Sequence, residues 1–172
     1  MVILITGASH TGKTVLAQRL IDKFRFSCLS IDHLKMGLIR SGNTTLTPED
    51  DDELTPYLWP IVSEMIKTAI ENGQNLIVEG CYVPFDWSSS FTGEYLQSIR
   101  FICLAMTDAY IDANLDLINK HSCAIESRLE DAACTAEELK RSNNYYAKGF
   151  GSVTLINDDF NAALNSVVEN LR

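Results

Sequence analysis

Gly7-Ala8-Ser9-His10-Thr11-Gly12-Lys13-Thr14 stands between an apolar run at 2–6 and a segment with helical periodicity at 13–24. These eight residues fit the pattern G-x-x-x-x-G-K-[S/T], in the strand, loop and helix context that the pattern needs. A chance match in a chain of this length has a probability on the order of one in two hundred. The stretch therefore predicts the strand–loop–helix unit from which an α/β fold is built.

The same residues suit an anion-binding loop. Gly7 and Gly12 let the backbone curl so that its N–H groups converge on phosphate oxygens, and the following helix adds its positive end. Lys13 would reach the β- and γ-phosphates, and the Thr14 hydroxyl would coordinate Mg²⁺. A turn that merely joins a strand to a helix does not explain this lysine and threonine together. We expect a nucleoside triphosphate to bind at Gly7, Ala8, Ser9, His10, Thr11, Gly12, Lys13, Thr14 and Val15.

The rest of the chain alternates short apolar runs with longer helical patterns. Further strands are expected at 27–31, 75–78, 100–106 and 152–156. Helices are expected at 32–40, from a cap at Thr47 to about 72, from a cap at Thr107 to about 119, from a capping box at Thr135 to about 148 with Gly149 beyond its end, and finally up to 171. Strands rich in Ile, Val and Leu with helical crossovers imply a parallel sheet covered on both faces. The expected architecture is a three-layer α/β/α sandwich in a single domain, 1–172.

Composition narrows the class of protein. The chain has 172 residues, 46% of them hydrophobic and 22% charged, which is ordinary for a globular domain. With 14 basic and 23 acidic side chains the net charge is −9, so nucleic acid and anionic membranes are poor partners. No apolar run near the start is long enough for a signal peptide or a membrane span, and five scattered cysteines suggest no disulfides. Of these, Cys28 and Cys103 lie in apolar runs and are expected to behave as small hydrophobes. We expect a soluble cytoplasmic protein.

Two acidic residues end predicted strands of the same sheet, where ligands of open α/β folds gather. Glu79 follows Leu76-Ile77-Val78 and could support Mg²⁺ with Thr14, or could be a solvated strand terminus. Asp32 ends the run 28–32 and could position or deprotonate a substrate hydroxyl, or cap the next helix. These roles of Asp32 are compatible.

The loop, the strand ending at Asp32 and the Leu-Ile-Val-Glu-Gly strand together resemble the adenylate-kinase-like group of P-loop kinases. This group includes shikimate, gluconate, 2-phosphoglycerate and chloramphenicol kinases. The resemblance implies a five-stranded parallel sheet in the order 2-3-1-4-5, an acceptor-binding region at about 32–74 and a lid at about 120–135. It also implies ATP with Mg²⁺ as the phosphoryl donor, with adenine held near 157–159.

The resemblance suggests further site residues. Glu79-Gly80 matches the Asp-Gly that ends the third strand of adenylate kinases, but the following Cys81-Tyr82-Val83-Pro84 lacks the arginine that those enzymes use on the acceptor phosphate. The expected substrate-binding residues are Asp32, Lys35, Arg40, Glu79 and Gly80; Lys35 and Arg40 could hold an anionic group or be solvated helix charges. Lids of this group place arginines on the transferring phosphoryl group, and Arg128 is the best-placed candidate, with a solvated surface arginine as the alternative. The catalytic set is then Lys13, Asp32 and Arg128.

Aromatic residues gather in sequence around the expected acceptor region, where they could wall a pocket or pack the core. They are Tyr57, Trp59, Tyr82, Phe85 and Trp87.

The predicted function is transfer of the γ-phosphoryl group of ATP to a hydroxyl of a small metabolite. A nucleoside monophosphate kinase is one alternative. A nucleotide-hydrolysing switch or an inactive nucleotide-binding protein is another. A guanine-nucleotide switch would need Asp-x-x-Gly after a strand, which the chain lacks, and Asn119-Lys120-His121-Ser122 has only the first half of a guanine-reading Asn-Lys-x-Asp.

Overall fold

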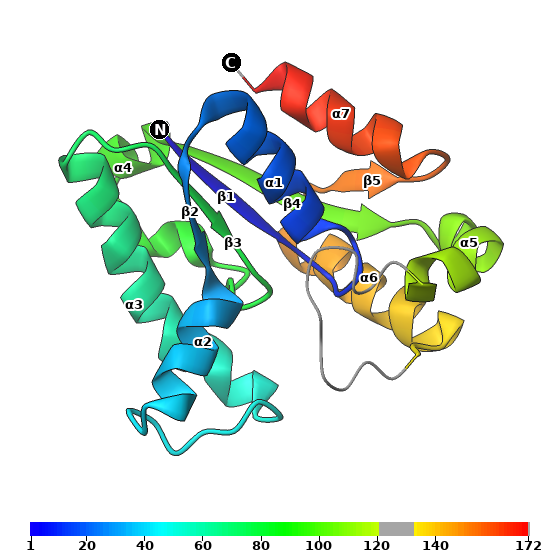
Figure 1. Cartoon of the computed structure of the whole chain (residues 1–172), viewed down its shortest axis with the longest axis horizontal. Helices are drawn as coiled ribbons and strands as arrows, with labels where there is room; N and C mark the ends of the chain where they lie inside the picture. Colours follow the sequence, from blue (N-terminus) through cyan, green and yellow to red (C-terminus); the bar gives the residue numbers. More distant parts are fainter. Residues whose placement is uncertain (121–132, 172) are drawn as a thin grey trace.

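Five parallel strands form one sheet in the order β2-β3-β1-β4-β5 (Figure 1). The computed structural model describes residues 1–120 and 133–171. The strands are β1 (Val2–Gly7), β2 (Ser27–Ser30), β3 (Leu76–Glu79), β4 (Ile99–Met106) and β5 (Thr154–Ile156). Both the strand order and the parallel pairing are as the resemblance implies, so the predicted fold class is confirmed.

Helices cover both faces of this sheet (Figure 1). In chain order they are α1 (Lys13–Phe24), α2 (Ile31–Arg40), α3 (Asp51–Glu71), α4 (Gly93–Gln97), α5 (Asp108–Lys120), α6 (Ala136–Phe150) and α7 (Phe160–Asn170), with a 3₁₀ turn η1 (Trp87–Ser90). Alternation along β1 decides the layers: Ile3 and Ile5 pack against α1 and α7, whereas Val2 and Leu4 pack against α3. The chain is therefore a three-layer α/β/α sandwich.

Helix α3 begins later than its sequence predicts. Thr47 is not its cap, because the Asp50 carboxylate accepts hydrogen bonds from the Thr47 N–H (2.7 Å) and hydroxyl (2.9 Å) and closes a separate turn there. These hydrogen bonds lower the pKa of Asp50, since they stabilise its ionised form. The helix starts at Asp51 and continues through Pro56 and Pro60, although each proline removes a backbone donor.

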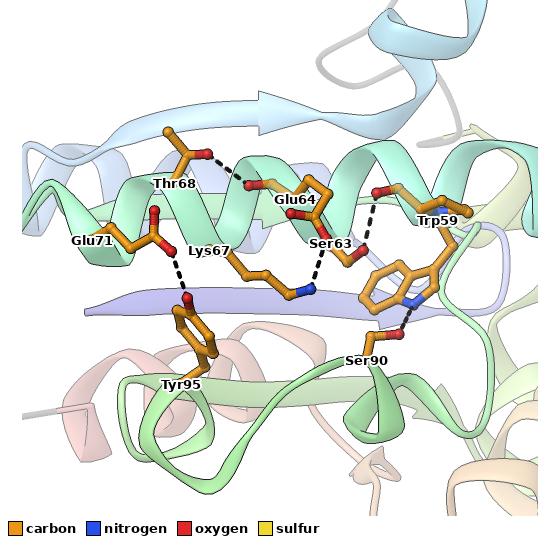
Figure 2. Close-up of polar contacts among 9 residues, drawn as sticks. Trp59, Ser63, Glu64, Lys67, Thr68, Glu71, Ser90 and Tyr95 are labelled. Atoms are coloured by element: carbon orange, nitrogen blue, oxygen red, sulfur yellow. Dashed lines mark hydrogen bonds and ion pairs between the residues drawn. The ribbon is translucent and has the colours of Figure 1, made fainter.

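Packing explains why α3 stays helical although it contains two prolines. One face of the helix is fully buried against the sheet, through Leu54, Leu58, Val62 and Ile66. Its other contacts reach the segment before β4: the Trp59 indole N–H donates to the Ser90 hydroxyl (2.9 Å), and the Tyr95 hydroxyl donates to Glu71 (Figure 2). The turn η1 and the helix α4, which carry these partners, lie in a stretch for which the sequence predicts no element.

The end of α6 is also different from the prediction. Gly149 lies inside the helix, which ends at Phe150 with Gly151 as its C-cap. Because a Cβ at Gly149 would collide with the Phe85 ring, this glycine serves close packing and does not end the helix. The predicted caps at the two helix starts nearby are confirmed: the Thr107 hydroxyl accepts from the Tyr110 N–H (3.2 Å), and Thr135 forms the full capping box with Glu138.

No helix within the described ranges is both long and apolar enough to cross a membrane. Cys28, Cys81 and Cys103 are free thiols. Cys103 is buried, as a small hydrophobe would be, whereas Cys28 is exposed on the edge strand β2, so the expectation of burial is wrong for that residue.

Two buried threonines near the end of β1 give opposite stability predictions. The Thr6 hydroxyl has no hydrogen-bond partner in the described part of the chain, whereas the Thr11 hydroxyl donates to the Ala8 carbonyl at 2.8 Å. We expect Thr6→Val to raise the free energy of unfolding by about 1 kcal/mol, and Thr11→Val to lower it by about 1 kcal/mol. Urea unfolding of the two matched variants checks this; changes of the same sign would contradict it.

Candidate functional site

The loop from Gly7 to Thr14 joins β1 to α1, and glycine is required at two of its positions. Gly12 has φ 83°, in the left-handed region that favours glycine. A side chain there would also strike the Phe160 ring of α7. At Gly7 a Cβ would strike the carbonyl oxygen of Leu104 on β4. The loop is thus fitted closely between α7 and the sheet.

Within the loop, two donors converge on one carbonyl. The Lys13 ammonium and the Thr11 hydroxyl each donate to the Ala8 carbonyl oxygen at 2.8 Å. Lys13 is 8% exposed, so its charge lies within the loop and not in open solvent. His10 has φ 67°, a conformation that is uncommon outside glycine and costs on the order of 1 kcal/mol or more. The loop holds a cation at the head of α1, where an anion is also favoured by the helix N-terminus.

The ends of β2, β3 and β1 lie in one row across the sheet. Ser30 pairs with Glu79, and Glu79 pairs with Ile5. Neighbouring strands are about 4.8 Å apart, so Ser30 at the end of β2 is about 10 Å from Ile5 of β1. Asp32, two residues beyond Ser30, therefore lies past the end of β2, at the same edge of the sheet as Glu79.

Thr14 and Glu79 meet at the centre of this row. The Thr14 hydroxyl donates to Glu79 Oε2 at 3.4 Å, and Glu79 is only 3% exposed. A hydroxyl and a buried carboxylate that face each other beside a phosphate-binding loop are suitable oxygen donors for Mg²⁺ or its water ligands. The residues present thus fit the predicted metal.

Asp32 is the second residue of α2, whose N-cap is Ser30. The alternative in which Asp32 caps this helix is therefore wrong. Its carboxylate lies 3.3 Å from the Lys35 ammonium, one turn further along, and its side chain is 35% exposed to the cleft and solvent. The carboxylate is held in place but stays accessible.

Lys35 continues this chain of contacts to α3. Its ammonium donates to the Tyr82 hydroxyl at 2.8 Å, and that hydroxyl donates to Asp51 Oδ1 at 2.9 Å. Burial and the two carboxylates Asp51 and Asp32 raise the pKa of Tyr82, so it stays a neutral hydroxyl. The network joins α2, the first turn of α3 and the segment after β3.

These residues line one open cleft of about 1,670 Å³. Its lining includes the predicted site residues Ser9, His10, Gly12, Lys13, Thr14, Val15, Asp32, Lys35, Arg40 and Glu79. A cleft of this size has room for a nucleotide and a second small molecule. The structure thus brings most of the sequence-predicted site together.

Other predicted site residues do not reach the cleft. Gly7, Ala8 and Thr11 shape the loop from within, and Gly80 lies against Ile31, where a Cβ would be 2.7 Å from the Ile31 Cβ. Residues 157–159, expected near adenine, are not among those that line the described cleft. Arg128 lies outside the described residues.

The aromatic residues divide between the cleft and the core. Trp59 and Trp87 pack with Phe91 in the core, whereas Tyr82 and Phe85 line the cleft.

Helix α6 adds Ser142, Tyr145 and Tyr146 to the lining of the cleft. From the sequence, the two tyrosines are expected to pack their own helix, and Ser142 gives no signal. Tyr146 donates to the Cys81 carbonyl at 3.0 Å, and its ring burial raises its pKa. The helical period of 136–150 predicts an amphipathic helix but gives no sign that its polar side faces a cleft.

Neither Cys28 nor Cys103 offers a reactive thiolate near this site. Burial raises the pKa of Cys103 to about 12, although nearby Lys13 opposes the shift. Desolvation and the Glu79 charge raise the pKa of Cys28 to about 11. Both thiols stay protonated at neutral pH and are poor nucleophiles.

Asn119 has a structural role. Its side-chain amide donates to the Cys134 carbonyl and accepts from the Cys134 N–H, both at 3.0 Å. The amide is engaged with backbone at the end of α5, which does not suit a residue that reads a guanine base.

No protein-family model and no curated protein matches this sequence. Among solved structures, the chain is similar to a protein of Chloroflexus aurantiacus that is assigned as a kinase. The two sequences are 20% identical, the TM-score is 0.59, and the match covers 99% of this chain and 98% of that one. It is similar to shikimate kinase from Bacteroides thetaiotaomicron (14% identity, TM-score 0.56, 99% and 98% covered). It is also similar to deoxyadenosine kinase from M. mycoides with dCMP and dCDP bound (14%, 0.56, 99% and 98%). The chain therefore has the fold found in small-molecule kinases.

Proposed function

We propose that this protein is an ATP-dependent phosphotransferase that moves the γ-phosphoryl group to a hydroxyl of a small molecule. The observation that carries the proposal is the row of functional groups across one cleft. The Lys13 loop, the Thr14–Glu79 pair and Asp32 follow one another along the ends of β1, β3 and β2. This order supports a transfer reaction, with the donor at the loop, the metal at Thr14 and Glu79 and the acceptor at Asp32.

Each group has a distinct role in this proposal. The loop N–H groups and Lys13 hold the triphosphate, with the ammonium exchanging the Ala8 carbonyl for phosphate oxygens. Thr14 and Glu79 would hold Mg²⁺, which neutralises charge on the phosphates when it is bound. Asp32, kept in position by Lys35, orients the acceptor hydroxyl and accepts its proton. Arg128 is proposed to act on the transferring phosphoryl group.

The main alternative is a nucleoside monophosphate kinase. Such an enzyme needs cationic side chains on the acceptor phosphate, and the segment 81–84 after β3 offers none. Of the two cations that line that end, Lys35 is already paired with Asp32, which leaves Arg40 alone for a phosphate. A hydroxyl acceptor therefore fits the cleft better than a phosphate acceptor.

An acceptor screen tests the proposal. Purified protein with Mg²⁺ and γ-labelled ATP is incubated with nucleosides, sugars, sugar acids and nucleoside monophosphates. We expect label to pass to a hydroxyl compound, with ADP formed in equal amount. Label on a nucleoside monophosphate would support the alternative. ATP hydrolysis that no acceptor changes would indicate a switch, and tight ATP binding without turnover would indicate an inactive binding protein.

A further inference from the structure

The end of the cleft away from the loop is rich in charge. This acceptor end is formed by α2, the residues just before and within the first turn of α3, the segment 81–85 and α6. Its carboxylates are Asp32, Glu49, Asp51 and Asp52, and its cations are Lys35 and Arg40. Four negative charges face two positive ones, so the acceptor end has a negative field.

The cation that lies deepest, Lys35, is already paired with protein groups. Lys35 has a side chain only 12% exposed, and its ammonium is held between Asp32 Oδ1 (3.3 Å) and the Tyr82 hydroxyl (2.8 Å). An acidic ligand would have to displace the Asp32 carboxylate from it. Lys35 therefore neutralises a carboxylate of the protein and does not recruit one from a substrate. This pairing favours a role in holding Asp32 over the expected role of holding an anionic group on the acceptor.

The same end carries aromatic surface. Phe85 and Tyr145 line the cleft with ring centroids 4.9 Å apart, and they are 39% and 62% exposed. Large aromatic rings that are left open inside a cleft can cover the face of a ring-shaped ligand. The negative quadrupole of such faces also favours a neighbouring cation. Charge and aromatic surface thus point to the same kind of molecule.

We propose that the acceptor is a ring compound that bears a hydroxyl and a protonated amine, and no acidic group. The inference rests on the proposed function and specifies its substrate class. A protonated amine would be attracted by Glu49 and Asp52 at the rim, while the ring packs on Phe85 and Tyr145. A carboxylate or phosphate on the acceptor would be repelled by Asp32, Glu49, Asp51 and Asp52, with Arg40 as the one opposing charge besides the paired Lys35.

Two matched series of ligands test the charge of the acceptor. One is pyridoxamine, pyridoxine and 4-pyridoxic acid; the other is glucosamine, glucose and glucuronic acid. In the first series one ring substituent changes from an aminomethyl group to a hydroxymethyl group and then to a carboxylate. In the sugar series the pyranose ring is kept, with the amine at C2 and the acid at C6. Affinity is measured by titration calorimetry with the full chain and a non-hydrolysable ATP analogue. We expect the amine to bind at least about 10-fold more tightly than the acid, with a smaller ratio at 0.5 M salt.

A double variant tests whether the preference for amines over acids arises from the rim of the cleft. Glu49→Gln with Asp52→Asn removes two rim charges with little change in shape, and we expect the amine-to-acid ratio to fall at least about threefold. Glu64→Gln is the control, because Glu64 is an exposed carboxylate on α3 that does not line the cleft (Figure 2). The amine-to-acid affinity ratio of Glu64→Gln should equal that of the unmodified chain.

The outcomes separate the two proposals. Acids that bind as tightly as their amines, or no binding by any amine, would overturn the charge inference. Transfer of label to a sugar acid in the acceptor screen would overturn it as well, while supporting a kinase. Amine-selective binding without transfer to any acceptor would support the charge inference and contradict the proposed function.

Discussion

Lys13→Ala is expected to lower the turnover number of phosphoryl transfer by about 100-fold or more. The ammonium is the one loop side chain that can place a full positive charge on the β- and γ-phosphates, and electrostatic groups of this kind supply factors of about 10²–10³ in rate. The fold should survive, because the Ala8 carbonyl loses its hydrogen bond from Lys13 in this variant but keeps the one from the Thr11 hydroxyl. ADP formation with the acceptor found in the screen gives the rate, and circular dichroism verifies the fold.

A second lysine of the same helix is the control for this variant. Lys23 is exposed in the last turn of α1, where its ammonium contacts the Val168 carbonyl outside the cleft. Lys23→Ala should keep the rate of the unmodified protein. Unchanged turnover in Lys13→Ala would remove the proposed mechanism, since the loop would then bind no reacting phosphate.

Asp32→Asn is expected to abolish most of the transfer while ATP still binds. The amide keeps the size of the side chain and can accept a hydrogen bond from Lys35, but it cannot take the proton of the acceptor hydroxyl. Loss of a positioned proton acceptor costs about 10²–10⁴ in rate. Asp32 lies on α2 and its carboxylate is paired with Lys35 and not with a residue of the loop, so the affinity for a fluorescent ATP analogue should stay within about twofold.

The matched control is Asp22→Asn, an exposed carboxylate of α1 that accepts from Gln18 and does not line the cleft. It should change neither transfer nor ATP affinity. If Asp32→Asn transfers phosphate at the normal rate, Asp32 only holds Lys35 in place and the acceptor is activated by another group. Weaker ATP binding in Asp32→Asn would show that the two ends of the cleft are not independent.

The strands and the nucleotide loop were predictable because their signals are local. Buried parallel strands such as β1 are continuous apolar runs, and the Gly7–Thr14 pattern carries its chemistry in eight consecutive residues. Strand order came from the resemblance, which the pairing of β1 with β3 and β4 confirms. The predicted helix ends were wrong where a residue typical of a helix end has another role. Thr47 forms a separate turn with Asp50, and Gly149 makes room for the Phe85 ring.

The acceptor end was predictable only in part, because its contacts join distant residues. Asp32 and Glu79 could be found, since strand ends meet at one edge of a parallel sheet. The contacts of Tyr82 with Lys35 and Asp51 span 47 and 31 positions, and no periodicity records such a pairing. The exposure of the Phe85 and Tyr145 rings in the cleft could not be predicted either, because the sequence does not distinguish a core aromatic residue from one that lines a cleft.

The Phe160 ring that rests on Gly12 has a consequence for the newly made chain. The loop emerges early in synthesis, but the helix that supports it is made far later, after all five strands. Arg19 of α1 also needs that helix, through Asn161 and Asn165. A ribosome-bound fragment without α7 would contain the complete loop motif but would lack the Phe160 ring that packs against Gly12. Full nucleotide affinity should therefore arise only when the helix has left the exit tunnel.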